Sequence, residues 1–333
     1  MSKILVVGPA WVGDMVMAQC LFKVLKKRGA EIDVLAPQWS LPLLERMPEV
    51  TAAITLPIGH GELALGKRYQ LAQKLRQKNY SEAIVLPNSF KSALIPFLAG
   101  IPKRTGWRGE MRYVLLNDLR VLDKQKYSLM IERFMALGFP KNEEPPTNIF
   151  PQLMVKEENI EKVKAKFEIK TTRPILALCP GAEFGPAKRW PEQYYAEVAL
   201  QKIREGFEIW IFGSTNDAPI AETITQLTHH RAVNFCGKTS LAEAIDLLSL
   251  VSGVVTNDSG LMHIAAALQK QLVAVYGPTS AGFTPPLYAG AKTVSLTLSC
   301  QPCFERECPL KHHRCMQELA PELVLNSMSE WKD

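Results

Sequence analysis

The stretch from Val254 to Leu268 constrains the fold more than any other part of the 333-residue chain. It begins with the apolar residues of a buried strand, continues through the polar turn Asn257-Asp258-Ser259, and ends in an apolar helical segment. The backbone N–H groups of the first helical turn lack helical partners, and together with the positive end of the helix dipole they form an anion site. The alternative is that Asp258 and Ser259 only cap a core helix.

Strands alternate with helices in both halves of the chain. Near the N-terminus, residues 4–7 predict a strand, residues 17–25 an apolar helix face, and residues 32–36 a second strand. With a right-handed crossover, this βαβ unit predicts a Rossmann-like beginning. Further strands in the second half are predicted at residues 174–179, 208–214 and 272–276. The sequence therefore predicts an α/β protein with two doubly wound domains.

The turn after the first predicted strand contains Gly8, Gly13 and Asp14. The glycine spacing matches the start of the phosphate loop Gly-x-x-x-x-Gly-Lys-Ser/Thr, but Asp14 replaces the lysine and would repel a phosphate. Neither half contains Gly-x-Gly-x-x-Gly, which argues against a nicotinamide-dependent oxidoreductase or an epimerase. Asp14 lies where α/β sheets hold their ligands. Its alternative role is to complement the helix dipole.

Positive charge is concentrated in the first half of the chain. The formal net charge is +6, and residues 1–165 carry 24 Lys and Arg against 16 Asp and Glu. Such a half suits an anionic partner, such as nucleic acid, a membrane surface or a phosphorylated glycolipid. Residues 102–113 combine four cations with a Trp and a Tyr, which suits bases, sugars or phosphates. No nucleic-acid-binding motif accompanies them, so nucleic acid is not an expected partner.

The N-terminal apolar segment is too short for a signal peptide, and no apolar run approaches the roughly 20 residues that span a bilayer. We therefore expect a cytoplasmic protein. Four of the seven cysteines gather late in the chain, at Cys300, Cys303, Cys308 and Cys315. With His312 and His313 between them they could hold a structural zinc, although the spacing is not a paired Cys-x₂-Cys pattern. The alternative is a compact loop with reduced thiols.

Several motifs together resemble the heptosyltransferases of glycosyltransferase family 9. They are the Gly13-Asp14 turn, Pro180-Gly181-Ala182, Lys188-Arg189-Trp190-Pro191, and Asn-Asp-Ser-Gly-Leu-Met-His at residues 257–263. The resemblance covers nearly the whole chain. Residues 86–93 and 104–113 resemble the members that add the second heptose of the series more than those that add the first.

The resemblance implies a GT-B fold and an inverting transfer that needs neither metal nor cofactor. Residues 1–168 would take the lipopolysaccharide acceptor, residues 169–318 would take ADP-heptose, and residues 319–333 would form a helix returning to the first domain. The implied reaction moves L-glycero-D-manno-heptose from ADP-heptose to the heptosyl-Kdo-lipid A acceptor, at the inner face of the cytoplasmic membrane. The alternatives are a neighbouring acceptor, as for heptosyltransferases I and III, or a nucleotide-sugar-binding protein without catalysis.

By the same resemblance, Asp14 matches the general base. The matched donor-site positions are Lys188, Asp258, Ser259, Gly260, Leu261 and His263. The candidates for acceptor phosphates or acidic sugars are Lys91, Arg104, Arg108 and Arg112. The residue types suit the chemistry, because a carboxylate can deprotonate a hydroxyl while lysine and helix N–H groups stabilise a leaving diphosphate. The alternative for His263 is a core histidine, and for Lys188 a solvated cation.

Overall fold

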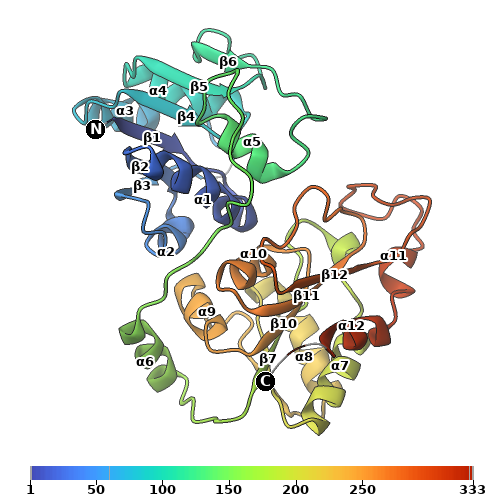
Figure 1. Ribbon diagram of the computed structural model, residues 1–333. Coiled ribbons are helices and arrows are strands. Elements are labelled where there is room, and N and C mark those ends of the chain that lie inside the picture. Colours follow the sequence, from blue (N-terminus) through green and yellow to red (C-terminus); the bar gives the residue numbers. More distant parts are fainter. Residues whose placement is uncertain (1, 60, 330, 332–333) are drawn as a thin grey trace. The chain divides into compact units, whose positions relative to one another are not determined.

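The computed structural model describes residues 2–59, 61–329 and 331. The chain divides into two compact units, unit 1 with residues 1–151 and unit 2 with residues 152–333. Each unit is built on one six-stranded sheet with helices packed against it (Figure 1). Within the described ranges, no helix combines the length and the apolar character needed to span a bilayer.

Unit 1 has an entirely parallel sheet in the order β3-β2-β1-β4-β5-β6. Its strands are β1 (Lys3–Val7), β2 (Glu31–Pro37), β3 (Ala52–Leu56), β4 (Glu82–Val85), β5 (Lys103–Trp107) and β6 (Asp118–Arg120). Its helices are α1 (Val12–Lys27), α2 (Leu41–Leu44), α3 (Leu65–Arg76), α4 (Leu94–Leu98) and α5 (Met130–Ala136), with short 3₁₀ turns η1 (Gln38–Ser40) and η2 (Phe90–Ala93). The central strand β1 is buried on both faces, as its continuous apolar run predicts.

Unit 2 repeats this architecture. Its strands are β7 (Ile175–Cys179), β8 (Glu208–Ile211), β9 (Ala232–Asn234), β10 (Gly253–Asn257), β11 (Gln271–Tyr276) and β12 (Ala291–Ser295). Its α-helices are α6 (Glu157–Lys166), α7 (Glu192–Arg204), α8 (Ala218–Leu227), α9 (Leu241–Leu248), α10 (Gly260–Ala267), α11 (Arg314–Gln317) and α12 (Pro321–Met328). Two further 3₁₀ turns are η3 (Pro186–Lys188) and η4 (Thr215–Asp217).

Both parallel sheets have the same strand order. The order β9-β8-β7-β10-β11-β12 in unit 2 corresponds strand for strand to β3-β2-β1-β4-β5-β6 in unit 1. In each sheet the direction of winding reverses between the first and fourth strands, β1 and β4 or β7 and β10. Doubly wound sheets bind ligands outside the carboxyl ends of their strands at this switch point. The predicted fold of two doubly wound domains is therefore confirmed.

Helices at the two ends of unit 2 pack against the interior elements of that unit. Unit 2 begins at residue 152, before the expected boundary at 168, because α6 packs against α9 and Lys166 forms a 2.6 Å ion pair with Glu243. The last helix, α12, packs against α7, β11 and β12 within unit 2. Its residues Val324 and Met328 belong to the core of unit 2, which accounts for this packing.

Candidate functional site

Asn257, the last residue of β10, joins the turns on either side of the switch point in unit 2. Its buried carboxamide oxygen accepts hydrogen bonds from the Trp190 backbone N–H (3.2 Å) and the Tyr195 hydroxyl (2.9 Å). Its amide nitrogen donates to the Pro180 carbonyl, 2.6 Å away. Because unpaired buried polar groups are costly, this residue holds the turn after β7 in a fixed register with the turn after β10.

The next residue, Asp258, is the centre of a charged cluster. Its Oδ2 accepts hydrogen bonds from Lys188 Nζ and from Thr279 Oγ1, each at 2.6 Å. Both side chains of the ion pair are largely shielded, with 12% of Lys188 and 6% of Asp258 exposed. Lys188 Nζ also lies 4.8 Å from the centre of the Phe184 ring. Three loops, which follow β7, β10 and β11, therefore meet at one carboxylate.

The N-terminus of α10 opens directly beside this cluster. The side chain of Ser259, in the N-cap position, makes no capping hydrogen bond to the helix, and its hydroxyl lies 3.3 Å from Thr256 Oγ1. Asp258 is engaged by Lys188 and Thr279, so neither polar residue of the turn acts as the cap that the simpler interpretation required. Ser259, Gly260 and Leu261 are partly exposed. The first-turn N–H groups point toward this edge and favour an anion.

His263 lies one turn further along α10 and is buried, with 5% of its surface exposed. Burial lowers the pKa of its imidazole to about 4, an effect that Lys188 strengthens and Asp258 opposes. The ring is therefore neutral at neutral pH. His263 is therefore a buried, uncharged side chain within α10.

The loop that carries Lys188 is held by a segment that the sequence analysis did not assign to the site. Arg306 Nε donates to the Phe184 carbonyl (2.6 Å), and the Ala187 N–H donates to the Arg306 carbonyl (3.2 Å). A Cβ at Gly185 would lie 2.3 Å from the Arg306 carbonyl oxygen, so only glycine permits this approach. The same segment reaches the loop after β11, where the backbone N–H of Phe304 donates to the Pro278 carbonyl at 2.7 Å.

The four late cysteines belong to this segment or border it. Burial and the three neighbouring thiols raise the pKa of Cys315 to about 11. At Cys308, burial is outweighed by hydrogen bonds from backbone N–H groups, which lower the pKa of the thiol. Its Sγ lies 4.0 Å from His312 Nδ1. In the described part of the chain, no three His, Cys, Asp or Glu side chains are arranged to hold a metal ion together.

In unit 1, Asp14 is in the first turn of α1 and is half-buried. This helix follows β1, so the carboxylate lies at the carboxyl edge of the sheet beside the switch point between β1 and β4. Unit 2 has an acidic residue in the equivalent first turn, Glu192 of α7, which follows β7. Asp14 therefore occupies a ligand-binding position of the fold, and the comparison with Glu192 offers a way to separate its two candidate roles.

Arg112, expected to contact the acceptor, is 1% exposed and serves the interior of unit 1. Its guanidinium donates to the carbonyls of Pro87 and Trp107, each at 2.6 Å, and to Asn88 Oδ1 at 3.0 Å. A weaker bond joins it to the Ser92 hydroxyl. Burial lowers its pKa to about 10. Arg112 thus ties the loop after β5 to the turn after β4, which makes it a positioning residue.

Of the other three acceptor candidates, one is bonded to backbone carbonyls as Arg112 is, and two have accessible side chains. Arg104 donates to the carbonyls of Leu115 (2.7 Å) and Ile101 (2.5 Å), and burial lowers its pKa. Lys91, in η2, is partly exposed, and Arg108, after β5, is exposed. Lys91 and Arg108 are therefore the two candidates whose side chains can reach a ligand in this conformation.

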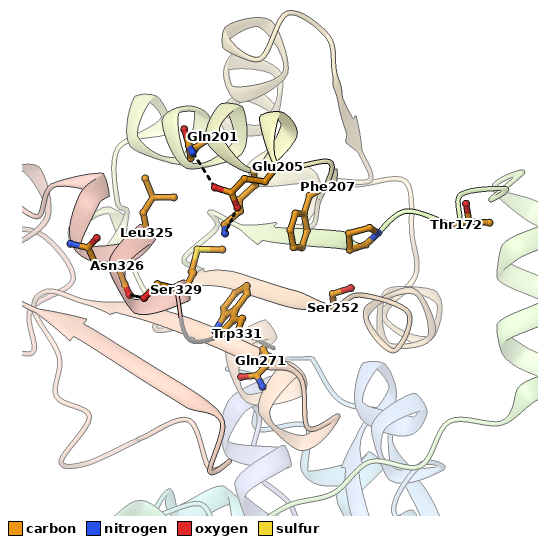
Figure 2. Close-up of a pocket in the computed structure, with 13 residues that line it drawn as sticks. Thr172, Gln201, Glu205, Phe207, Ser252, Gln271, Leu325, Asn326, Ser329 and Trp331 are labelled. Atoms are coloured by element: carbon orange, nitrogen blue, oxygen red, sulfur yellow. Dashed lines mark hydrogen bonds and ion pairs between the residues drawn. The ribbon is translucent and has the colours of Figure 1, made fainter. Parts of the chain in front are cut away.

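A separate cavity of about 880 Å³ lies in unit 2 at the amino-terminal edge of the sheet (Figure 2). Phe207 and Trp331 contribute rings to it, and Glu205 accepts hydrogen bonds from Gln201 and Lys202 in its wall. Some of its lining residues precede or begin β7, β8, β10 and β11, and the others come from the ends of α7 and α12, whereas Asp258 follows β10. The cavity is therefore distinct from the anion site, because the two lie at opposite edges of one parallel sheet.

Solved structures resemble the whole chain. The structure of Escherichia coli ADP-heptose lipopolysaccharide heptosyltransferase II superimposes with a TM-score of 0.87 and 45% identity, covering 98% of this chain and 97% of that one. A glycosyl transferase family 9 protein from Veillonella parvula shares the fold with a TM-score of 0.82 at 18% identity, covering 98% and 96%. The first of these likenesses, at 45% identity over nearly the whole chain, defines a glycosyltransferase with the GT-B fold.

Sequence relatives narrow this class. The model of glycosyltransferase family 9 (heptosyltransferase) matches residues 68–314. Lipopolysaccharide heptosyltransferase 2 of Escherichia coli K12 is 47% identical over 98% of this chain and 97% of its own length. Lipooligosaccharide heptosyltransferase 2 of Haemophilus influenzae is 46% identical over 98% and 99%. The chain belongs to glycosyltransferase family 9, as its motifs predict.

Proposed function

We propose that this enzyme is a heptosyltransferase of the second step, moving L-glycero-D-manno-heptose from ADP-heptose to the heptosyl-Kdo-lipid A acceptor of the lipopolysaccharide inner core. The observation that carries the proposal is the Lys188–Asp258–Thr279 cluster beside the open N-terminus of α10. A site that offers helix N–H groups, a lysine and a carboxylate suits a diphosphate joined to a polyhydroxylated sugar. The names and near-complete coverage of the relatives support this choice of donor and acceptor.

The donor diphosphate binds at the first turn of α10 in this proposal. The backbone N–H groups of Ser259, Gly260 and Leu261 donate hydrogen bonds to its oxygens. The ammonium group of Lys188, which pairs with Asp258, also donates to the diphosphate. Asp258 then accepts hydrogen bonds from heptose hydroxyls, because a carboxylate repels phosphate. The neutral ring of His263 supports the helix beneath. The arrangement stabilises the charge that the leaving ADP gains in the transition state.

Asp14 is the proposed general base. Its carboxylate takes the proton of the acceptor hydroxyl while that oxygen forms a bond to the anomeric carbon of heptose. The bond from that carbon to the diphosphate oxygen breaks on the opposite face, so the anomeric configuration inverts and ADP leaves with the electron pair. In this proposal the carboxylate comes from unit 1 and the diphosphate site from unit 2.

The acceptor is proposed to bind to unit 1. Lys91 and Arg108 contact its phosphates or acidic sugars, while Arg104 and Arg112 hold the loops that carry them. Because this acceptor is embedded in a bilayer, the enzyme works in peripheral contact with the inner face of the cytoplasmic membrane. The basic character of the first half of the chain supports this location.

The test is a transfer assay with ADP-heptose and Kdo-lipid A acceptors that carry zero, one or two heptoses. We expect turnover on the acceptor with one heptose and little on the other two. Preferred turnover on one of the others would assign the enzyme to the first or third step. Binding of ADP-heptose without transfer to any acceptor would overturn catalysis and favour a nucleotide-sugar-binding protein.

A further inference from the structure

The carboxyl edge of the sheet in unit 1 exposes large apolar side chains after every strand. Those that follow β1 to β6 and are at least 37% exposed include Trp11, Trp39, Leu63, Leu65, Tyr69, Phe90, Met111, Tyr113, Val114 and Val121. We call this set the apolar rim. Because all six strands are parallel, the loops that follow them lie at the same edge of the sheet. Exposed apolar groups gathered at one edge indicate an interaction surface.

Two buried arginines hold the loops of the rim in place. Arg68 donates to the carbonyls of Leu63 (2.6 Å) and Lys91 (3.0 Å), which joins the loop after β3 to the turn after β4. Arg112 joins that turn to the loop after β5 through the carbonyls of Pro87 and Trp107. The rim is therefore built on loops that are fixed to one another, and its apolar side chains are exposed by a stable conformation.

The loop after β5 has the most exposed apolar side chains of the rim, next to a buried arginine. Met111 and Val114 are 81% and 77% exposed, while Arg112 between them is 1% exposed. The following residues, Leu115 and Leu116, are buried in the core of unit 1. The chain thus turns one polar residue inward and two apolar residues outward at its tip, which is the reverse of the arrangement that water favours.

Cations lie among the apolar residues of the rim. Lys67 is exposed between Leu65 and Tyr69, and Arg108 is exposed in the loop that carries Met111. Unit 2 exposes fewer such side chains: in its described residues the loops after β7, β8, β9, β10 and β11 expose no large apolar side chain, and the segment after β12 exposes Phe304 and Leu310. Apolar side chains interspersed with cations fit the interface of an anionic bilayer, where the rings and chains enter the headgroup region and the cations meet lipid phosphates.

We propose that the apolar rim is a lipid-binding surface that seats unit 1 on an anionic membrane. Lipid is chosen as the ligand of this surface for two reasons. The cations of the rim complement an anionic membrane, and the acceptor of the proposed function, on which this second reason rests, is linked to a lipid. Met111 and Val114 form the tip that enters the interface, and the rim brings the carboxyl edge of the sheet, with Asp14, to the surface in which the acceptor is anchored.

The experiment measures binding of the full chain to vesicles of phosphatidylethanolamine with phosphatidylglycerol, without acceptor or donor. The variant M111S/V114S removes the apolar tip, and M154S/V233S makes the same changes at exposed positions of unit 2. We expect the first variant to bind at least about tenfold more weakly than the natural chain and the second to bind equally well. High salt should weaken binding of the natural chain, because the cations of the rim would be screened.

A second readout separates this proposal from the proposed function. Heptosyl transfer to a deacylated, water-soluble acceptor should be the same for M111S/V114S and the natural chain, because that acceptor needs no membrane. If the natural chain transfers no heptose but the vesicle result holds, only the proposed function fails. Equal vesicle binding by both variants, or no binding by the natural chain, would overturn the lipid surface. Self-association that M111S/V114S abolishes without any vesicle binding would assign the rim to a second copy of the chain.

Discussion

The turn after β1 and the turn after β7 occupy equivalent positions in two sheets of the same order, yet they present opposite charges. The first carries Asp14 in a helical turn, whereas the second leads to Lys188, which is paired with Asp258. The surrounding edges differ as well, because exposed apolar residues follow every strand of unit 1, whereas in the described residues of unit 2 they follow only β12 among the loops at this edge. The shared strand order supplies the positions, and the side chains added to the edge determine what each unit binds.

Replacing Asp14 should have the largest effect and is the most direct test of the difference between the turns after β1 and β7. We expect D14N to lower heptosyl transfer by about 10²–10⁴-fold while ADP-heptose binding is retained, because the amide cannot accept the proton. The matched control is E192Q in unit 2, which removes the equivalent first-turn carboxylate. If Asp14 only complements the helix dipole, both variants should lose about 0.3–1 kcal/mol of stability and keep their turnover.

The next largest loss of activity is expected when Lys188 is replaced. K188A removes the cation proposed to stabilise the leaving diphosphate, and we expect kcat/KM to fall by about 10²–10³-fold. Asp258 would keep its bond to Thr279 but lose its charged partner. K238A, at an exposed lysine of the same unit, is the control in steady-state assays. Equal kcat/KM values for the two variants would remove Lys188 from the donor site.

A pH effect should be visible in unit 2, because burial lowers the pKa of His263 to about 4, below its ordinary value of 6.5. The unfolded chain binds this proton more readily, so the stability contribution is fully present above about pH 6.5 and is lost as the pH falls toward 4. We expect the unfolding free energy to fall by up to about 3 kcal/mol over this range. Urea unfolding followed by the fluorescence of the six tryptophans measures it.

The variant H263Q serves as the control for this pH effect. It removes the titrating group, so the part of the pH slope between pH 6.5 and 4 that belongs to His263 should disappear even if the variant is less stable at every pH. An unchanged slope would show that another titratable group of the chain is responsible.

The smallest expected change concerns Thr279, whose hydroxyl donates to Asp258 at 2.6 Å. T279V keeps the shape of the side chain and removes one hydrogen bond, worth about 1 kcal/mol, so we expect the KM for ADP-heptose to rise about fivefold. The control is T284V, at another threonine of the same loop, whose backbone carbonyl accepts a hydrogen bond from the Tyr276 hydroxyl. A rise of the same size in T284V would contradict a specific role for the bond.

The fold could be predicted from the sequence because its central strands are continuous apolar runs between turns. Residues 4–7 and 272–276 were predicted as strands and lie within β1 and β11. The sequence pattern does not indicate strand β5, at residues 103–107. They begin with two cations, and the buried Thr105 is satisfied by Glu82 and Asp118 on neighbouring strands. Its burial depends on partners that no local pattern reveals.

The candidate site was predictable to a similar degree. The turn at Asp258 and the cation at Lys188 are visible as motifs, and the structure brings them together at 2.6 Å. The inward direction of Arg112 was not predictable, because its partners are chiefly backbone carbonyls, which are the same in every sequence. The contribution of Arg306 was also hidden, since the residue it holds, Phe184, is 122 positions away in the chain.

The buried guanidinium of Arg112 has a consequence for building chimaeras from related enzymes. It draws its hydrogen-bond acceptors from both the turn at residues 87–92 and the loop that begins at Trp107. Transplanting the loop alone would bring an arginine into a host turn shaped for a different partner, or leave the host turn without its donor. The two segments therefore form one exchangeable cassette, and acceptor preference should be transferred between enzymes only when both are moved together.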